Sequence, residues 1–305
     1  GRYFGAICND AVKNLQQPGV DTVSNLTTIL LDDFEALNDK LWRFLVSLQQ
    51  HSGADLIVAG DPHRLIQDGS LSDLHAAYLD RIAQLARDLG ASRVSVRHLQ
   101  ADLRCADKIH RAVSVIRSEA VQGETGNEWI LPNGAERPRH RTPLIRFFSN
   151  QEDEYAYLRR EIARISGGTV LVQAHQRRDV KRIRHRLRED GFTLDRRIRV
   201  ETINRATPLE ADNVFVMETD FPSDQGDGAR GKWARIYSAA SRACNRLELL
   251  TAQPYSRFAA LPAAHDLSSE CHIQNSQQSV VKEFHKLPQI GKRKKNYTRR
   301  DRKST

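Results

Sequence analysis

The sequence predicts an α/β fold, because strand-like and helix-like patterns alternate along it and the strands are apolar and β-branched, as in a buried parallel sheet. Near the start, apolar runs at 26–31 and 54–59 flank a helical pattern at 37–48, which together form a βαβ unit. Both runs end in acid, at Asp32, Asp33 and Asp61. Ligands of open α/β sheets bind where the strands end, so these carboxylates suit a hard cation and an activated water. A solvated acidic turn would explain the same pattern.

Length and composition predict a soluble protein of two domains. The chain has 305 residues, of which 39% are hydrophobic and 28% charged. It contains no secretory signal and no apolar run near the ~18 residues of a membrane helix, so we expect no membrane partner. Four cysteines, none in a Cys-x-x-Cys pair, predict reduced thiols: Cys8, Cys105, Cys244 and Cys271. We therefore expect an intracellular protein, cytoplasmic if bacterial, that is not secreted.

The positive charge is concentrated at the C-terminal end. Residues 291–305 carry eight Lys or Arg and one Asp, so this stretch holds +7 of the net charge of +9. The segment before it is polar, and we expect residues 263–305 to be mostly disordered and to end in a basic arm. A polyanion is one partner for such an arm. A localisation signal or a solubilising end is the alternative.

The remaining elements follow from residue spacing. Helices are predicted where apolar residues recur every three or four positions, strands where β-branched residues cluster, and loops where Gly, Pro and Asn gather. In chain order these are a helix in 68–92, a strand over 94–99, a helix around 109–116, an exposed loop over 117–142, strands over 144–148, 169–174, 198–202, 213–217 and 247–251, and helices over 152–165 and 177–188.

The helix predicted at 177–188 is strongly basic, since seven of its residues are Lys or Arg and its apolar stripe is narrow. Contact with nucleic-acid phosphates through Arg177, Arg178 and Lys181 would use this charge. A solvated helix face would explain it equally well.

The acidic strand ends resemble two motifs of superfamily 1 DNA helicases of the UvrD/Rep type. Residues 32–36 (Asp-Asp-Phe-Glu-Ala) resemble the Walker B pattern Asp-Glu-x-Gln-Asp, and residues 60–64 (Gly-Asp-Pro-His-Arg) resemble the Gly-Asp-x-x-Gln pattern that follows it. The resemblance implies that Asp32 holds Mg²⁺, that Asp33 orients the attacking water and that Arg64 stands where the γ-phosphate is sensed. Asp33 is one methylene shorter than the family's Glu, and Arg64 replaces a Gln.

Two further stretches resemble the arginine-bearing motifs of this family. Residues 99–105 (Leu-Gln-Ala-Asp-Leu-Arg-Cys) resemble Leu-x-x-Asn-Tyr-Arg-Ser. This implies that Leu103 packs on adenine in place of a Tyr and that Arg104 contacts the γ-phosphate, although a surface arginine is the simpler interpretation. Residues 236–243 (Ile-Tyr-Ser-Ala-Ala-Ser-Arg-Ala) resemble Leu-Tyr-Val-Ala-x-Thr-Arg-Ala, which makes Arg242 the arginine finger.

Residues 202–210 (Thr-Ile-Asn-Arg-Ala-Thr-Pro-Leu-Glu) resemble the family motif Thr-Ile-His-x-Ala-Lys-Gly-Leu-Glu. The resemblance implies that Glu210 contacts the nucleotide sugar and that the stretch at Thr202, Asn204 and Arg205 faces nucleic acid. Pro208 replaces a Gly of the motif. Because proline fixes φ and has no backbone N–H to donate, coupling between the nucleotide site and the nucleic-acid site is in question.

The resemblance covers residues 26 to about 252 and implies RecA-like parallel sheets of the P-loop NTPase and helicase type. Residues 1–97 would be the C-terminal part of a first domain and 98–262 a second, with ATP and Mg²⁺ between them and single-stranded DNA or a duplex junction across the top. No Gly-x-x-x-x-Gly-Lys-[Ser/Thr] motif is present. Since the chain starts at Gly1 and has one Met, Met217, we expect a processed or partial chain whose P-loop lies upstream or on a partner protein.

Two functions stay open. The first is an ATP-dependent DNA helicase or translocase motor, and it is favoured by Arg104, Glu210 and Arg242, which a pure scaffold does not need. The second is a catalytically inactive, helicase-like nucleic-acid-binding or scaffold protein. It is favoured by the absent P-loop and by the substitutions noted above. The accessory domain that the family inserts before the Thr-Ile-His motif is absent, since only residues 189–197 separate the flanking patterns.

Overall fold

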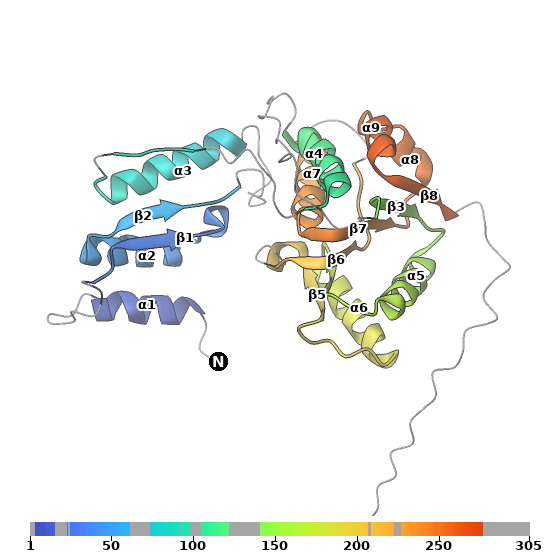
Figure 1. The fold of residues 1–305 in the computed structure, drawn as a ribbon, viewed down its shortest axis with the longest axis horizontal. Helices are drawn as coiled ribbons and strands as arrows, with labels where there is room; N and C mark the ends of the chain where they lie inside the picture. Colours follow the sequence, from blue (N-terminus) through green and yellow to red (C-terminus); the bar gives the residue numbers. More distant parts are fainter. Residues whose placement is uncertain are drawn as a thin grey trace, which may run out of the picture.

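The computed structural model describes residues 4–15, 23, 25–61, 74–91, 93–97, 105–121, 141–206, 209–222 and 227–276 (Figure 1). It confirms the α/β fold, with a two-stranded sheet of order β1-β2 and a six-stranded sheet of order β5-β4-β6-β7-β3-β8. Each of the described strand pairs is parallel. We call the described residues 4–97 the N-terminal body and the described residues 105–276 the C-terminal body.

The N-terminal body is the predicted βαβ unit with two further helices. Strands β1 (Thr28–Leu31) and β2 (Asp55–Val58) are joined by α2 (Asp39–Ser52). Asn38 caps α2 by accepting two backbone N–H groups, and Gly53 ends it in the left-handed region at φ 65°. Helix α3 (Leu74–Asp88) follows β2, and α1 (Phe4–Leu15) packs on α2.

Only one face of the two-stranded sheet is covered by described residues. Its side chains Ile29, Leu31, Leu56 and Val58 pack on a core that α2 and α3 supply. On the other face Leu30 and Ile57 are register partners, and they are 74% and 56% exposed. Parallel sheets in globular proteins are normally covered on both faces, so this bare pair is unusual.

The prediction of a strand over 94–99 is wrong for residues 94–97, which are the part of it that the structure describes. Residues 93–97 have no assigned strand, and Val94 and Val96 are about half exposed. Alternating valines favour an extended backbone, but a strand also needs a neighbour to accept its hydrogen bonds. None of the described strands lies alongside this segment.

The C-terminal body is a parallel sheet with helices on both faces (Figure 1). Its strands are β3 (Leu144–Phe147), β4 (Val170–Ala174), β5 (Ile198–Thr202), β6 (Ala211–Val216), β7 (Ala243–Thr251) and β8 (His272–Asn275). One face carries α5 (Gln151–Arg164) and α6 (Arg177–Glu189). The other carries α4 (Asp107–Val121), α7 (Asp227–Ala240), α8 (Tyr255–Ala259) and α9 (Ala263–Glu270).

Strand β4, which lies between β5 and β6, shows why the sheet needs two layers of helices. All five of its residues are buried, with Val170 and Val172 in the α5/α6 layer and Leu171 in the α4/α7 layer. Gln173 follows on the α4/α7 side and is fully buried although it is polar. A polar side chain at such a position must find a hydrogen bond.

Two sequence predictions need correction. Residues 263–276 are ordered rather than disordered, because α9 buries Ala263 and Leu267 in the core and β8 pairs with β3 through Ile273 and Ile145. A few well-spaced apolar residues suffice to anchor an otherwise polar segment. The loop predicted over 117–142 begins later, since α4 continues to Val121. The basic arm at 291–305 lies outside the described residues.

Among the described helices, none combines the length and the apolar character that crossing a bilayer requires. Cys105, Cys244 and Cys271 are free thiols.

Candidate functional site

The acidic turn after β1 lies at the surface of the N-terminal body. Asp32 is exposed, and its Oδ1 accepts the backbone N–H of Asp33 at 2.9 Å. Asp33 adopts a left-handed conformation at φ 52°, which is uncommon for a residue with a side chain and which Asp tolerates better than most. The turn leads into a short 3-10 helix, Phe34–Ala36. Phe34 is fully buried, so the two aspartates remain outside the core while the chain re-enters it.

Glu35 is a buried acid that the sequence analysis did not single out. It is 3% exposed, and its Oε2 accepts the backbone N–H of Asp61 at 3.0 Å. Gly60 makes this approach possible, because a Cβ there would lie 2.5 Å from the same oxygen and 2.6 Å from the Tyr78 hydroxyl. Burial, reinforced by the negative charges of Glu35 and Asp61, raises the pKa of Tyr78 to about 12. The residues that follow β2 therefore pack closely around the buried Glu35 carboxylate.

A hydrogen bond between described residues joins this strand end to the C-terminal body. The hydroxyl of Tyr237, on α7, donates to Oδ2 of Asp61 at 2.6 Å. Tyr237 is 5% exposed and its ring belongs to the core of the C-terminal body. Tyr237 lies in the motif at 236–243, but the resemblance implied no role for it. The available signal was a hydroxyl-bearing ring in an otherwise apolar stripe of α7.

Arg242 follows the end of α7 and is 2% exposed. Its backbone N–H donates to the carbonyl of Ala239 and its Nε donates to the carbonyl of Ser238, each at 3.3 Å. Helix ends leave carbonyls without intrahelical partners, and arginine side chains can supply the missing donors. The guanidinium thus folds back on the last turn of its own helix.

Each of these two carbonyls has a second donor that does not depend on Arg242. The side-chain amide of Gln173 donates to the carbonyl of Ala239 at 2.9 Å, and the hydroxyl of Ser241 donates to that of Ser238 at 3.1 Å. Departure of the Arg242 side chain would leave both carbonyls satisfied. The buried Gln173 of β4 therefore has a structural reason that its sequence position alone did not reveal.

Other predicted nucleotide contacts are placed only in part. Glu210 is exposed and directly precedes β6, and the N–H of its neighbour Ala211 donates to the carbonyl of Arg242 at 3.1 Å. The start of α4 lies near the same strand end, since the N–H of Ala106 donates to the carbonyl of Cys244 at 3.0 Å. Arg64, Leu103 and Arg104 lie outside the described residues, so their roles stay predictions.

The predicted nucleic-acid contacts on the loop after β5 differ in exposure. Thr202 ends the strand and is buried, whereas Asn204 and Arg205 are exposed on the short 3-10 helix Ile203–Arg205. Only the latter two could touch a ligand without rearrangement. Thr207 and Pro208, the substituted part of this motif, lie outside the described residues.

Helix α6 sorts its basic residues into two groups. Three pair with acids of other elements: Arg182 with Glu218, Arg184 with Glu201 and Arg186 with Glu152. Arg177, Arg178 and Lys181 are exposed near the start of the helix, and Arg178, whose side chain is 78% exposed, has Asp179 within 3.6 Å. The predicted phosphate contacts are therefore among the exposed basic residues of this helix, which also include Arg188.

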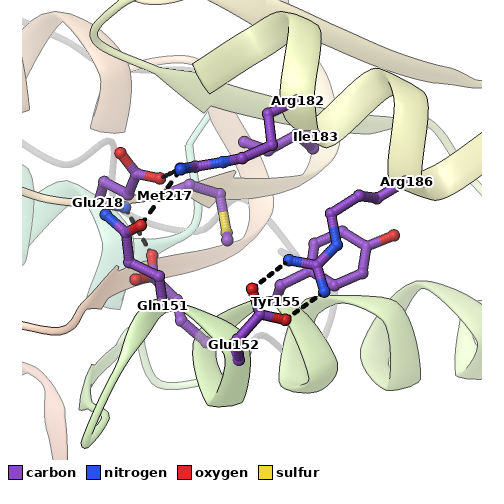
Figure 2. Close-up of a pocket in the computed structure, with 9 residues that line it drawn as sticks. Gln151, Glu152, Tyr155, Arg182, Ile183, Arg186, Met217 and Glu218 are labelled. Carbon is purple, nitrogen blue, oxygen red and sulfur yellow. Dashed lines mark hydrogen bonds and ion pairs between the residues drawn. The ribbon is translucent and has the colours of Figure 1, made fainter. Parts of the chain in front are cut away.

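A small cavity of about 20 Å³ lies between α5, α6 and the end of β6 (Figure 2). Its volume and polar lining suit a single water. Glu154 lines it and is fully buried, and burial raises the pKa of this carboxyl to about 8. The cavity lies on the inner side of α6, where Arg182 and Arg186 line it. Arg177, Arg178 and Lys181 do not line it.

The described residues contain no group of three His, Cys, Asp or Glu side chains arranged to hold a metal ion. Mg²⁺ in nucleotide sites commonly takes only one or two protein carboxylates and completes its shell with water and phosphate oxygens. Asp32, exposed at the end of β1, fits the protein's share of such a shell.

No protein-family model matches the chain, and no curated protein matches it. Among solved structures, the chain is similar to the C-terminal domain of a possible DNA helicase from Lactobacillus plantarum WCFS1, with a TM-score of 0.41 and 15% identity over 56% of this chain and 97% of that one. It is also similar to an Arterivirus nonstructural protein 10 (helicase) solved with DNA, with a TM-score of 0.29 and 12% identity over 44% of this chain and 35% of that one. Likenesses this weak carry no argument for function, which must be argued from the site.

Proposed function

We propose that this chain is part of a UvrD-like, ATP-dependent DNA translocase motor with RecA-like bodies. The observation that carries the proposal is the Tyr237–Asp61 hydrogen bond. It brings the acidic strand ends of one body against α7 of the other body, the helix that Arg242 follows. Phosphoryl-transfer sites of this kind need carboxylates and an arginine on opposite sides of one phosphate chain. The motif resemblance at 32–36 and 236–243 supports the same assignment.

In this proposal the residues have distinct tasks. Asp32 would hold Mg²⁺, which when bound neutralises charge on the phosphates. Asp33 orients the attacking water, and Glu210, exposed before β6, contacts the nucleotide sugar. The phosphate-binding loop must come from a segment or partner outside these 305 residues, since the sequence contains no such motif.

Arg242 acts by moving from its helix to the transferred phosphoryl group. Its side-chain Nε donates to the neutral carbonyl of Ser238 at 3.3 Å, and a phosphate oxygen forms a stronger, charge-assisted bond. Because the Ser241 hydroxyl also donates to the Ser238 carbonyl, that carbonyl keeps a donor when the Arg242 side chain leaves. Arginine fingers of this kind contribute about 10³ to 10⁵ in rate.

The DNA contacts are tested through the salt dependence of binding. Arg177, Arg178 and Lys181 should each neutralise one phosphate, so the triple Gln variant should reduce the slope of log K against log salt on single-stranded DNA by about 2, at ~0.7 per contact. The matched control removes three exposed arginines elsewhere, Arg196, Arg199 and Arg257. If both variants change the slope equally, α6 is not the contact surface.

An inactive nucleic-acid-binding protein is the second candidate, favoured by the burial of Arg242 at 2% exposure. The two candidates differ in nucleotide binding. On the motor proposal, a fluorescent ATP analogue with Mg²⁺ binds the chain weakly, and Arg242→Lys weakens it further because Lys lacks the planar fork. Steady hydrolysis should be negligible without a P-loop. An analogue that binds the wild type and Arg242→Lys alike, or not at all, favours the inactive candidate.

A further inference from the structure

We infer that Tyr237 is a positioning residue that sets the spacing between the acidic strand ends and Arg242. The inference rests on the proposed function, because it assigns a purpose to that spacing. Its geometric content is independent of the reaction: the Tyr237 hydroxyl links the two bodies, and removing it should loosen their relative placement.

Two consecutive hydrogen bonds form this joint. The Tyr237 hydroxyl donates to the Asp61 carboxylate at 2.6 Å, and the Asp61 backbone N–H donates to Glu35 Oε2 at 3.0 Å. Glu35 lies two residues after Asp33, in the 3-10 helix that this aspartate begins. A displacement of α7 would therefore be transmitted to the acidic turn through short, directional contacts.

The joint is also continuous with Arg242. The carbonyl of Tyr237 accepts the N–H of Ser241 at 2.9 Å, and Arg242 is the next residue. Helix α7 is well packed between Tyr237 and its end, where Ala239 and Ala240 are fully buried. Tyr237 and Arg242 thus belong to one rigid segment, and fixing the first fixes the second.

Burial makes the Tyr237–Asp61 bond strong enough for this role. The phenol oxygen and the carboxylate are 2.6 Å apart, which is the length of a charge-assisted O–H···O⁻ bond. The Tyr237 side chain is almost fully buried and Asp61 is partly buried, so water competes little for either group. Glu35 remains buried at the far end of the chain of bonds.

The hydroxyl can be removed without disturbing the core. The ring of Tyr237 belongs to the apolar cluster of α4 and α7, and a phenylalanine would fill the same volume. Core packing and the inter-body contact are therefore separable. Tyr155 offers a matched control, because its hydroxyl donates to Asp190 Oδ2 at 2.8 Å entirely within the C-terminal body.

The test measures the distance between the bodies in the full chain. Fluorescent labels are placed through non-canonical amino acids at the exposed positions Gln50 on α2 and Glu189 on α6, and single-molecule energy transfer is recorded without nucleotide. The wild type should give one narrow distribution. Tyr237→Phe and Asp61→Ala should each broaden it, and the double variant should do no more than either alone. Tyr155→Phe should leave it narrow.

A narrow distribution in both Tyr237→Phe and Asp61→Ala would overturn the inference, as would equal broadening in Tyr155→Phe. Circular dichroism checks that each variant is folded, and Asp61→Ala, which replaces a partly exposed side chain, serves if Tyr237→Phe is not. The readout needs neither DNA nor nucleotide. Failure of the proposed function would appear in the salt slope and analogue binding, and failure of the joint only in the distance distribution.

Discussion

The backbone N–H of Glu218 donates to the carboxyl of Glu154 at 2.6 Å, across the turn that follows β6. Glu154 is fully buried on α5, and Glu218 adopts a left-handed conformation at φ 52° to reach it. Arg182 pairs with Glu218 from α6. Glu154 and Glu218 thus connect the three elements that frame the cavity of Figure 2.

This arrangement predicts a pH dependence of stability. Burial raises the pKa of Glu154 from 4.5 to about 8, so between these values the folded protein holds a proton that the unfolded chain releases. The stabilisation that protonated Glu154 gives the folded state is therefore fully present below pH 4.5 and lost as pH rises through 8. Over this range the free energy of unfolding should fall by up to about 1.4 kcal/mol per pH unit. Urea unfolding of the wild type and Glu154→Gln between pH 5 and 9 should show a flatter profile in the variant. If the free energy of unfolding changed with pH equally in both proteins, Glu154 would be charged in the folded state.

Gly60→Ala should destabilise the N-terminal body by about 1–3 kcal/mol through overpacking. The new Cβ would lie 2.5 Å from Glu35 Oε2 and 2.6 Å from the Tyr78 hydroxyl, and neither buried side chain can move away freely. Gly167→Ala is the control, since a Cβ there meets no atom within 4 Å. Urea unfolding that gives equal midpoints for the two variants would contradict the packing described for the end of β2.

Arg246→Met should cost about 3–5 kcal/mol, because it removes the buried arginine that two buried carboxylates share. Arg246 donates to Glu161 Oε2 and, through Nε, to Glu248 Oε1, each at 2.7 Å, and all three residues are less than 10% exposed. Arg164 also pairs with Glu161, at 2.9 Å, but its side chain is 66% exposed. Arg164→Met should therefore cost at most about 1 kcal/mol. Chemical denaturation would refute the burial argument if the two costs were equal.

The basic arm gives a prediction that depends on sequence alone. If all eight Lys and Arg of residues 291–305 contacted duplex phosphates, the slope of log K against log salt would include about −7 from the arm, at ~0.9 per contact. We expect roughly half of this value, because a basic arm engages only partly. Binding of duplex DNA by the full chain and by a chain ended at Ile290 measures it. Equal affinity and equal slope would remove the arm from DNA binding.

Local patterns predicted the strands and helices well, because β-branched runs and apolar stripes report which face of an element is buried. The course of β4 and the apolar stripe of α6 at Val180, Ile183 and Leu187 could be predicted in this way. Residues 93–97 could not, since their outcome depends on a neighbouring strand. Residues 263–276 could not, since a few buried side chains outweigh a polar composition.

The site was less predictable, because its contacts join residues far apart in the sequence. The motif at 236–243 indicated Arg242, but not its burial or the hydrogen bond of its side chain to the Ser238 carbonyl. Glu35 acquires its role only when β1 and β2 pair and bring Gly60 beside it. Sequence spacing indicates which residues are chemically able to act, and folding decides which of them meet.

The bare face of the two-stranded sheet has a calorimetric consequence. Leu30 and Ile57 on this face, and Val94 and Val96 in the neighbouring non-strand segment 93–97, are each more than half exposed in the folded chain, so unfolding adds little to their contact with water. The heat-capacity increment of unfolding comes largely from newly hydrated apolar surface. The N-terminal body should therefore melt with a smaller increment per residue than the C-terminal body, and with a stability that varies less with temperature.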